Sequence, residues 1–203
     1  MTFNPEIHHR RSIRLHDHDY ASGGAYFVTI CTFQRECLFG VVAGGDMLLN
    51  GCGEIVREEW ETTAVMRHNV ELDAYVIMPN HFHAVLFMND HVGAHCMRPD
   101  VGLDQARGGS EGARSAVMNI RAHSSAPLQR QSGSIGSIIA GFKSAVTKRV
   151  NALRDNPGCS IWQRNYYEHI IRNEADLANV RQYIANNPLK WDLDENNPAN
   201  VTM

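Results

Sequence analysis

The chain has 203 residues, a length typical of one domain with extensions and sufficient to bury roughly 70% of the unfolded surface. Hydrophobic residues make up 43% and charged residues 20%, which excludes a wholly disordered, collagen-like or fibrous chain. The formal net charge of -3 argues against a protein that coats duplex DNA, because such proteins usually carry a basic excess.

The first residues, MTFNPEIHHRR, contain no apolar h-region, and apolar runs such as AVLFM are far too short to span a bilayer. We therefore expect a soluble, cytoplasmic protein with no membrane partner. The cysteines are odd in number and never spaced as C-x-x-C: Cys31, Cys37, Cys52, Cys96 and Cys159. This scatter predicts free thiols rather than disulfides or a zinc knuckle.

The first half of the chain predicts three main strands and one helix. Residues 25–33 are dense in β-branched and aromatic residues and predict a strand, and a short hairpin through Gly44-Gly45-Asp46 follows. Asn50 is a suitable N-cap for a helix from about Gly51 to Met66. LDAYVIM and HFHAVLFM, separated by Pro79-Asn80, predict neighbouring antiparallel strands, because proline cannot donate to a central ladder.

The second half begins with a long irregular stretch. From Asn89 to about Gly133 the sequence loses periodicity and fills with Gly, Ser, Arg and Asp, which predicts a mobile insertion, poorly ordered without a partner. A helical apolar stripe then runs from Ile135 to Leu153. The segment SIWQRNYYEHIIR predicts a fourth main strand, and residues from Glu174 to about Asn187 predict a closing helix stopped by proline.

The order β, α, β, β, α, β followed by a terminal helix is the split βαβ, ferredoxin-like arrangement of an α+β protein. Such a fold has one antiparallel sheet with helices on one face and leaves the other face free for a site. We expect a basic, His-rich arm over residues 1–19, a domain over 20–191 that includes the insertion at about 89–133, and an acidic tail over 192–203.

Two H-x-H triplets occur in different contexts. His16-Asp17-His18 lies in the polar arm, where a solvated loop is predicted. In His81-Phe82-His83, a strand period of two places both imidazoles on one face and Phe82 in the helix-covered core. Two adjacent imidazoles are half of a metal site. At this point the alternative that both merely form hydrogen bonds at a strand end stays open.

The predicted terminal helix carries a second group of polar residues. Leu177, Val180 and Ile184 form its packing stripe, whereas Tyr183 and Asn187 are four residues apart and share a different face, from which they can approach the histidines. A tyrosine in a helix is equally explained as a half-buried packing residue. Asn187 precedes a proline, and this position is biased away from helical geometry.

Four segments in this order, YVIMPNHFHAVLFM, IIAGFKSAVTKRV, WQRNYYEHIIRNEADL and RQYIANNPLKW, resemble the single-tyrosine HUH transposases, in particular the REP-associated tyrosine transposase group. The resemblance covers roughly Tyr20 to Trp191. It implies that His81 and His83 are the metal ligands of the HUH element and that Tyr183 is the nucleophile. Asn187, four residues beyond the tyrosine, matches a third ligand found in some relatives.

The resemblance implies metal-dependent cleavage and rejoining of single-stranded DNA, on hairpin or repeated palindromic sequences. Tyr183 would form a 5′-phosphotyrosine and release a 3′-OH. The expected cofactor is a divalent ion that polarises the scissile phosphate. A histidine pair favours Mn²⁺ by affinity and Mg²⁺ by abundance. Relatives work as monomers or as dimers, so we expect a monomer or a homodimer.

Basic residues are concentrated in one part of the chain, and between residues 114 and 154 no acidic residue interrupts them: Arg114, Arg121, Arg130, Lys143, Lys148, Arg149 and Arg154. In the N-terminal arm, Arg10, Arg11 and Arg14 resemble a segment that helps to hold DNA hairpins in the family. We predict DNA contacts from Arg10, Arg11, Arg14, Lys143, Lys148 and Arg149, although a solvated helix face explains each one equally well. A local basic region in an otherwise acidic chain suits a groove for a single strand.

Tyr166 and Tyr167 are adjacent on the predicted fourth strand, so at most one of them faces the site. Packing, or stacking against a base, is the favoured role for both. Two rival functions remain. An RNA-binding sheet of the ferredoxin-like type would leave the histidine pair without a role. A metal phosphoesterase that uses water as the nucleophile would make Tyr183 dispensable.

Overall fold

The computed structural model describes residues 23–89 and 133–200. The N-terminal arm, with the first H-x-H triplet and its arginines, and nearly all of the expected insertion lie outside the described residues. The elements in chain order are β1 (Gly24–Cys31), the 3-10 helix η1 (Phe33–Arg35), β2 (Gly40–Ala43), β3 (Asp46–Leu49), α1 (Gly51–Met66), β4 (Val70–Ile77), β5 (His81–Met88), α2 (Ile135–Leu153), β6 (Tyr167–Ile171), α3 (Glu174–Asn186) and the 3-10 helices η2 (Pro188–Leu193) and η3 (Pro198–Asn200).

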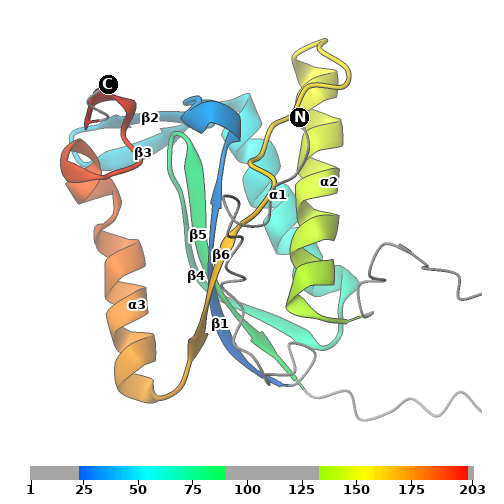
Figure 1. The fold of residues 1–203 in the computed structure, drawn as a ribbon, viewed down its shortest axis with the longest axis vertical. Coiled ribbons are helices and arrows are strands. Elements are labelled where there is room, and N and C mark those ends of the chain that lie inside the picture. The colour runs from blue at the N-terminus through cyan, green and yellow to red at the C-terminus, as the bar shows by residue number, and fades with distance from the viewer. Residues whose placement is uncertain (1–22, 90–132, 201–203) are drawn as a thin grey trace, which may run out of the picture. The chain divides into compact units, whose positions relative to one another are not determined.

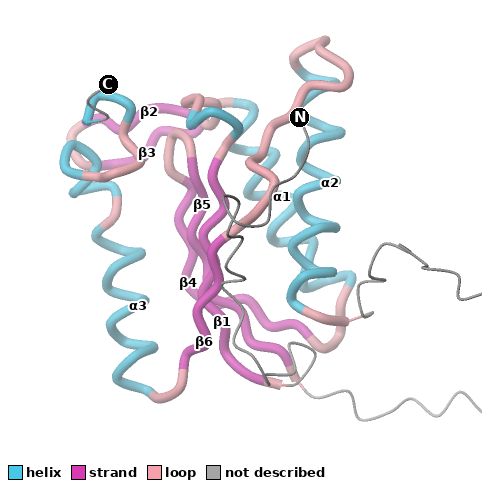
Figure 2. The backbone as a smooth tube through the Cα atoms, in the orientation of Figure 1, coloured by secondary structure: helices cyan, strands magenta, loops and turns pink. Residues whose placement is uncertain are grey.

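The main sheet has four antiparallel strands in the order β4-β5-β1-β6. Strands β1 and β4 are connected through α1, and strands β5 and β6 through a segment that includes α2, which is the split βαβ topology. Helices α1 and α2 lie on one side of this sheet and α3 on the other (Figure 1, Figure 2). The predicted α+β, ferredoxin-like fold with a terminal helix that bears Tyr183 is therefore confirmed.

Local signals explain where the elements begin. The Asn50 side chain accepts hydrogen bonds from the backbone N–H groups of Cys52 and Gly53 at 2.9 and 3.1 Å, so it caps α1 as predicted. The predicted hairpin forms between β2 and β3, where Gly44 and Gly45 have φ angles of 63° and 86°. Two consecutive positive φ angles match the tight turn that glycine permits without a steric penalty.

The sheet face under α1 and α2 carries the larger apolar core. Phe82 of β5 is fully buried there, with ring centroids 5.0 Å from Trp60 of α1 and 5.4 Å from Phe142 of α2. Tyr26 and Val28 of β1 belong to the same cluster. The prediction that Phe82 points into the helix-covered core, away from its two histidine neighbours, is confirmed.

The opposite face is covered by α3 through a smaller apolar cluster. Leu177 and Ile184 are buried from α3 against strand residues of this face, and Val180 packs beside them. The helix is also tied to both edges of the sheet by polar contacts. Arg181 pairs with Asp73 of β4 at 2.7 Å, and His169 of β6 lies 3.0 Å from Asp176. These contacts hold α3 across the face on which the histidines lie.

The fourth strand is shorter than predicted. Only Tyr167–Ile171 forms a strand, and the preceding residues 160–166 make a loop with a single bridge between Trp162 and Thr32. The physical reason lies on α2, because the Lys143 ammonium group donates to the carbonyl oxygens of Gln163 at 2.6 Å and Arg164 at 3.3 Å. These carbonyl groups therefore bond to a lysine in place of a neighbouring strand.

Two further expectations concern the whole chain. The cysteines within the described residues are free thiols, as predicted: Cys31, Cys37, Cys52 and Cys159. Among the helices that the structure describes, none combines the length and the apolar character needed to cross a membrane.

Candidate active site

The histidine pair lies at the start of β5, on the face of the sheet that α3 covers. His81 pairs with Cys31 of β1 and His83 with Thr29, so both imidazoles are in the interior of the sheet. Their ring centroids are 4.6 Å apart, and their exposed fractions are 0% and 2%. The side-by-side placement predicted from the strand period is therefore present, and both rings are buried.

Asn80 fixes the orientation of His81. Its side-chain amide donates to the carbonyl oxygens of Arg35 at 3.0 Å and Asn196 at 2.7 Å, which leaves Oδ1 as the atom 3.0 Å from His81 Nδ1. Because Oδ1 can only accept, His81 Nδ1 carries the proton and Nε2 carries the lone pair. This is the tautomer in which a metal ligand is held by a second group behind it.

Thr29 and Phe27 hold His83 in place. The Thr29 hydroxyl lies 2.8 Å from His83 Nδ1, and the Phe27 ring stacks on the imidazole at 5.5 Å. On the other side of the ring, the Tyr183 hydroxyl is 3.3 Å from His83 Nε2. In the tautomer that carries its proton on Nδ1, His83 donates to the Thr29 hydroxyl, and Nε2 can accept from the Tyr183 phenol. The tyrosine of α3 and the histidine of β5 therefore meet directly.

Both imidazoles are neutral at neutral pH. Burial lowers the pKa of His81 below its usual value, and the neighbouring Asp194 and Asn187 only partly oppose this effect. Burial lowers the pKa of His83 well below its usual value, and the nearby His81 adds to the shift. Neutral imidazole, the form that these shifts favour, is the form that can bind a metal ion.

Tyr183 lies at the border between this site and solvent. It is 46% exposed, and its ring is edge-on to Phe27 at 6.0 Å and to His83 at 5.1 Å. Partial burial, followed by the charge of Asp194, raises the pKa of its phenol, while Asn187 acts in the opposite direction. The phenol is therefore protonated at neutral pH, and it is the accessible member of an otherwise buried group.

Asn187 follows α3 directly and remains in helical geometry, with φ -60° and ψ -45°. The expectation that the following proline would push it out of this geometry is wrong. Pro188 opens the 3-10 helix η2, and proline at the first position of a helix lacks only an N–H that would be unpaired there. Asn187 is 3% exposed, and its side chain opposes the effect of burial on the pKa of both His81 and Tyr183.

Two buried acceptor atoms at this site, His81 Nε2 and Asn187 Oδ1, have no hydrogen-bond partner of good geometry within the described residues. An unpaired buried acceptor costs about 1–3 kcal/mol, a penalty that a bound cation removes. Across residues 23–89 and 133–200, no three His, Cys, Asp or Glu side chains form a metal-binding group. The fit to a divalent ion therefore depends on the two imidazoles together with an amide oxygen, which His81, His83 and Asn187 supply.

The structure separates Tyr166 from Tyr167. Thr29 pairs with both His83 and Tyr167, so these three residues form one row across the sheet, on the face of the site. Tyr167 is 50% exposed, with its ring 6.4 Å from that of Phe27. Tyr166 packs against the core on the other side of the sheet. As strand alternation predicts, only one of the two tyrosines faces the histidines.

The basic residues of α2 lie across the sheet from the histidines, because α2 and α3 cover opposite faces (Figure 1). Arg149 is ion-paired with Glu58 at 2.5 Å and Glu59 at 2.9 Å, and Lys143 holds the loop carbonyl groups described above. Arg149 and Lys143 therefore have structural partners within the protein. The DNA contacts of Lys143, Lys148 and Arg149 stay predictions. Arg10, Arg11 and Arg14 lie outside the described residues.

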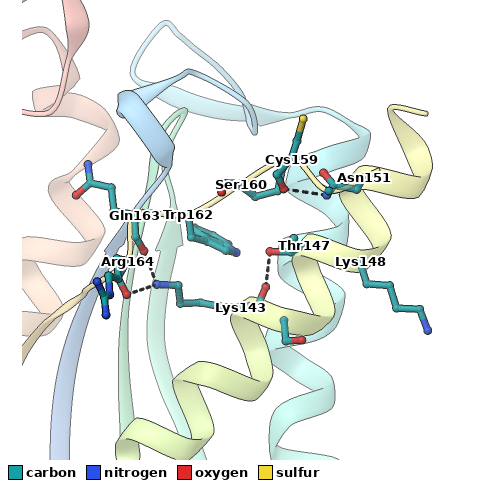
Figure 3. A pocket seen from close by; sticks show the side chains of 12 residues that line it. Lys143, Thr147, Lys148, Asn151, Cys159, Ser160, Trp162, Gln163 and Arg164 are labelled. Carbon is teal, nitrogen blue, oxygen red and sulfur yellow. Dashed lines mark hydrogen bonds between the residues drawn. The ribbon is translucent and has the colours of Figure 1, made fainter. Parts of the chain in front are cut away.

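An open groove of about 610 Å³ lies between α2 and the loop from Gly158 to Arg164. Its lining includes Lys143, Lys148 and Arg164 and no acidic residue (Figure 3). In this view Lys148 extends away from the loop, whereas Lys143 reaches toward it. The groove is thus a basic surface that is separate from the histidine site.

Sequence reasoning missed three residues of the site. Asn80 was assigned only to the turn before β5, although its position next to the H-x-H triplet was a signal for a supporting role. Thr29 follows from strand alternation once Phe27 is placed on the same face. Asp194 gave no signal, because it lies in a tail without a periodic pattern, and its carboxylate is 3.8 Å from His81 Nε2.

The arrangement of sheet, buried histidine pair and tyrosine helix defines a transposase-like fold. A solved structure of a REP-associated tyrosine transposase bound to a REP hairpin matches 87% of this chain and 73% of its own, with 18% identity and a TM-score of 0.50. At this identity the match establishes the fold. The resemblance to the REP-associated tyrosine transposases that the sequence motifs carry is confirmed.

The chain belongs to the same family as a Haemophilus influenzae protein described as an uncharacterized protein, with 38% identity over 193 residues that cover 95% of this chain and 96% of the relative. A second Haemophilus influenzae protein, named "Putative REP-associated tyrosine transposase", is 57% identical over 30 residues, or 15% of this chain and 17% of that protein. No protein-family model matches the chain.

Proposed function

We propose that this protein is a metal-dependent single-stranded DNA endonuclease and strand transferase that acts through a 5′-phosphotyrosine on Tyr183. The observation that carries the proposal is the 3.3 Å contact between the Tyr183 hydroxyl and Nε2 of a buried histidine, within an H-x-H pair. A nucleophile beside a group with open ligand positions is the combination that phosphoryl transfer requires.

The proposed ligands of a divalent ion, Mg²⁺ or Mn²⁺, are His81, His83 and Asn187. When bound, the ion supplies positive charge that stabilises the scissile phosphate and the departing oxygen. Asn80 keeps His81 in the ligating tautomer through its contact with Nδ1, and the Thr29 hydroxyl can accept from Nδ1 of His83 in the same tautomer. Phe27 excludes water from one side of His83 by stacking on it.

Tyr183 performs the covalent step. Its phenolic oxygen attacks the phosphorus in line, the bond between phosphorus and the 3′ oxygen breaks, and that oxygen takes up a proton to become a 3′-OH. The phenolic proton is lost as the new P–O bond forms. Attack by a DNA 3′-OH on the phosphotyrosine then restores the tyrosine and a phosphodiester, so no external energy source is needed.

The proposed substrate is single-stranded or hairpin DNA, on repeated palindromic sequences. The solved structure with the same fold is described as bound to a REP hairpin, and this supports the choice of substrate. Tyr167 adds a local argument, because a half-exposed ring in the same row as His83 offers a surface on which an unpaired base can stack.

The rival functions explain less of the site. An RNA-binding sheet leaves the two unpaired buried acceptors, His81 Nε2 and Asn187 Oδ1, without a reason. A phosphoesterase that uses water gives no role to the hydroxyl that α3 brings to His83. The strand-transfer proposal uses both observations.

The test is incubation of the full chain with a single-stranded hairpin oligonucleotide and Mn²⁺ or Mg²⁺, followed by denaturing electrophoresis. We expect a covalent protein–DNA adduct that Tyr183→Phe abolishes. Tyr75→Phe is the matched control, because Tyr75 lies on β4 and packs against the opposite core. If Tyr183→Phe cuts the oligonucleotide at the normal rate, the phosphotyrosine mechanism is wrong and hydrolysis by water is favoured.

A further inference from the structure

The open groove between α2 and the loop before β6 has basic side chains on both of its walls. Lys148 stands on α2 and Arg164 on the loop (Figure 3). Both are exposed, and neither forms an ion pair within the described residues. Arg149, the next residue of α2, is by contrast paired with Glu58 and Glu59. The groove therefore keeps positive charge that no described carboxylate balances.

Several carbonyl groups of the loop are already bonded within the protein. The Asn151 side-chain amide donates to the carbonyl oxygen of Cys159 at 2.9 Å. The Lys143 ammonium group donates to those of Gln163 and Arg164. A paired carbonyl oxygen does not compete with a ligand for the remaining cations of the groove. The groove is thus suited to an anionic ligand such as a phosphate.

Trp162 anchors the loop wall of the groove to the apolar core. It is 6% exposed, and its ring centroid lies 5.1 Å from that of Phe39 and 6.0 Å from that of Phe142. Its backbone also forms the bridge with Thr32. Because the loop is held by this packing and by the hydrogen bonds above, the groove is formed before a ligand arrives, and binding costs little ordering of the protein.

The groove and the candidate active site lie on either side of the same edge strand. The strand order β4-β5-β1-β6 leaves β6 at the edge of the sheet. Arg164 precedes Tyr167 by three residues, and Tyr167 is half-exposed on the histidine face. Three residues span at most about 10 Å, which about three nucleotides of one strand cover at about 3.4 Å each. One DNA strand can therefore contact both residues while it passes around β6.

We propose that this groove binds the phosphates of a single-stranded DNA segment that leads from the hairpin to Tyr183. This inference rests on the proposed function, since it concerns the same substrate. Lys148 and Arg164 contact the phosphates, and Tyr167 offers its ring to a base at the edge of the sheet. A basic groove followed by an aromatic ring holds single strands without reading their sequence. The groove thus fixes the path of the strand.

The test compares a labelled hairpin that carries a single-stranded tail with the same hairpin without the tail, by fluorescence anisotropy with the full chain at several salt concentrations. We expect Lys148→Gln and Arg164→Gln each to weaken binding of the tailed hairpin about threefold at about 50 mM salt. The slope of log K against log salt concentration should become shallower by about 0.7 for each lost contact with a single-strand phosphate. The hairpin without the tail should bind with the wild-type affinity.

Arg57→Gln is the matched control, because it removes one positive charge from a residue of α1 that is paired with Glu54 and Glu61 outside the groove. It should change neither the affinity nor the slope.

Unchanged affinity and slope for the tailed hairpin in the double variant Lys148→Gln/Arg164→Gln overturn the inference. An equal loss for both oligonucleotides would place the hairpin stem in the groove and overturn the assignment to a single strand. Displacement of the tail by inorganic phosphate at constant ionic strength would assign the groove to free phosphate. Adduct formation by the wild type, and its loss in Tyr183→Phe, are measured separately, so a failure of the groove leaves the proposed function standing.

Discussion

The two faces of the sheet differ in what their side chains do. On the face under α1 and α2, β5 contributes Phe82, and aromatic rings fill the space around it. On the face under α3, the same strand contributes His81 and His83, which are both buried and form hydrogen bonds with Asn80 and Thr29. One strand thus contributes to the main apolar core on one side and to the candidate active site on the other.

The candidate active site is therefore polar and buried at the same time. On the α3 face, buried polar atoms replace part of the apolar core, and two of them remain unpaired within the described residues. Such atoms lower the free energy of unfolding unless an ion or a substrate binds them. Substitutions on the α3 face should therefore change DNA cleavage and metal binding, whereas substitutions on the opposite face should change the free energy of unfolding.

The largest expected effect is on the chemical face. His81→Ala or His83→Ala should lower metal-dependent DNA cleavage by about 10⁴-fold, or about 5.5 kcal/mol in the activation free energy, because each removes a proposed ligand. Binding of the oligonucleotide should change little. Cleavage rates and a filter-binding assay check this, and normal cleavage in both variants would exclude the histidines as ligands.

The next effect is on the opposite face. Phe82→Ala should lower the free energy of unfolding by about 3–5 kcal/mol, because it opens a cavity between Trp60 and Phe142. Urea unfolding measures the loss. The folded fraction should still bind metal with nearly the affinity of the wild type. A large loss of metal affinity per folded molecule would show that the two faces are not separable.

A smaller effect is expected from the support of His83. Thr29→Val keeps the shape of the side chain but removes the oxygen that lies 2.8 Å from Nδ1, and it should weaken metal binding by about 10–100-fold. Thr62→Val is the control, because the Thr62 hydroxyl bonds only within α1, to the Glu58 carbonyl oxygen. Calorimetric titration with Mn²⁺ distinguishes the two, and equal affinities would remove Thr29 from the site.

The smallest effect is on the pH dependence of stability without metal. The pKa of His83 is lowered in the folded protein, so below about pH 6.5 the unfolded chain binds more protons than the folded one. The stabilising contribution is complete above that pH and is lost as the pH falls toward the folded pKa. We expect the free energy of unfolding, measured by urea unfolding in EDTA, to fall from pH 7.5 to 5.5, and to fall less in His83→Asn.

The fold was largely predictable because its signals are local. Alternation in β5 separates Phe82 from the two histidines, and the Asn50 cap marks the start of α1. The length of β6 was not predictable, because the loop before it is held by Lys143, a residue that lies twenty positions earlier on another element. A tertiary contact of this kind leaves no periodic pattern in the sequence.

The residues of the site that follow from local spacing were predictable, whereas a residue brought to the site from a distant part of the chain was not. The strand period brought His81 and His83 together, and the resemblance supplied Tyr183 and Asn187. The proline rule failed for Asn187 because a 3-10 helix follows it. Asp194 lies near His81 because the Asn80 side chain holds the turn after η2. No local sequence pattern predicts this long-range contact.

The chemical identity of the protein–DNA link tests the phosphotyrosine mechanism most directly. The adduct formed with a hairpin oligonucleotide and Mn²⁺ should be digested with a protease and a nuclease, and the modified peptide should be sequenced by tandem mass spectrometry. We predict a single phosphotyrosine at Tyr183, joined to the 5′ end of the cleaved strand. A link at Tyr167 or another residue, or cleavage without any covalent adduct, would contradict nucleophilic attack by Tyr183.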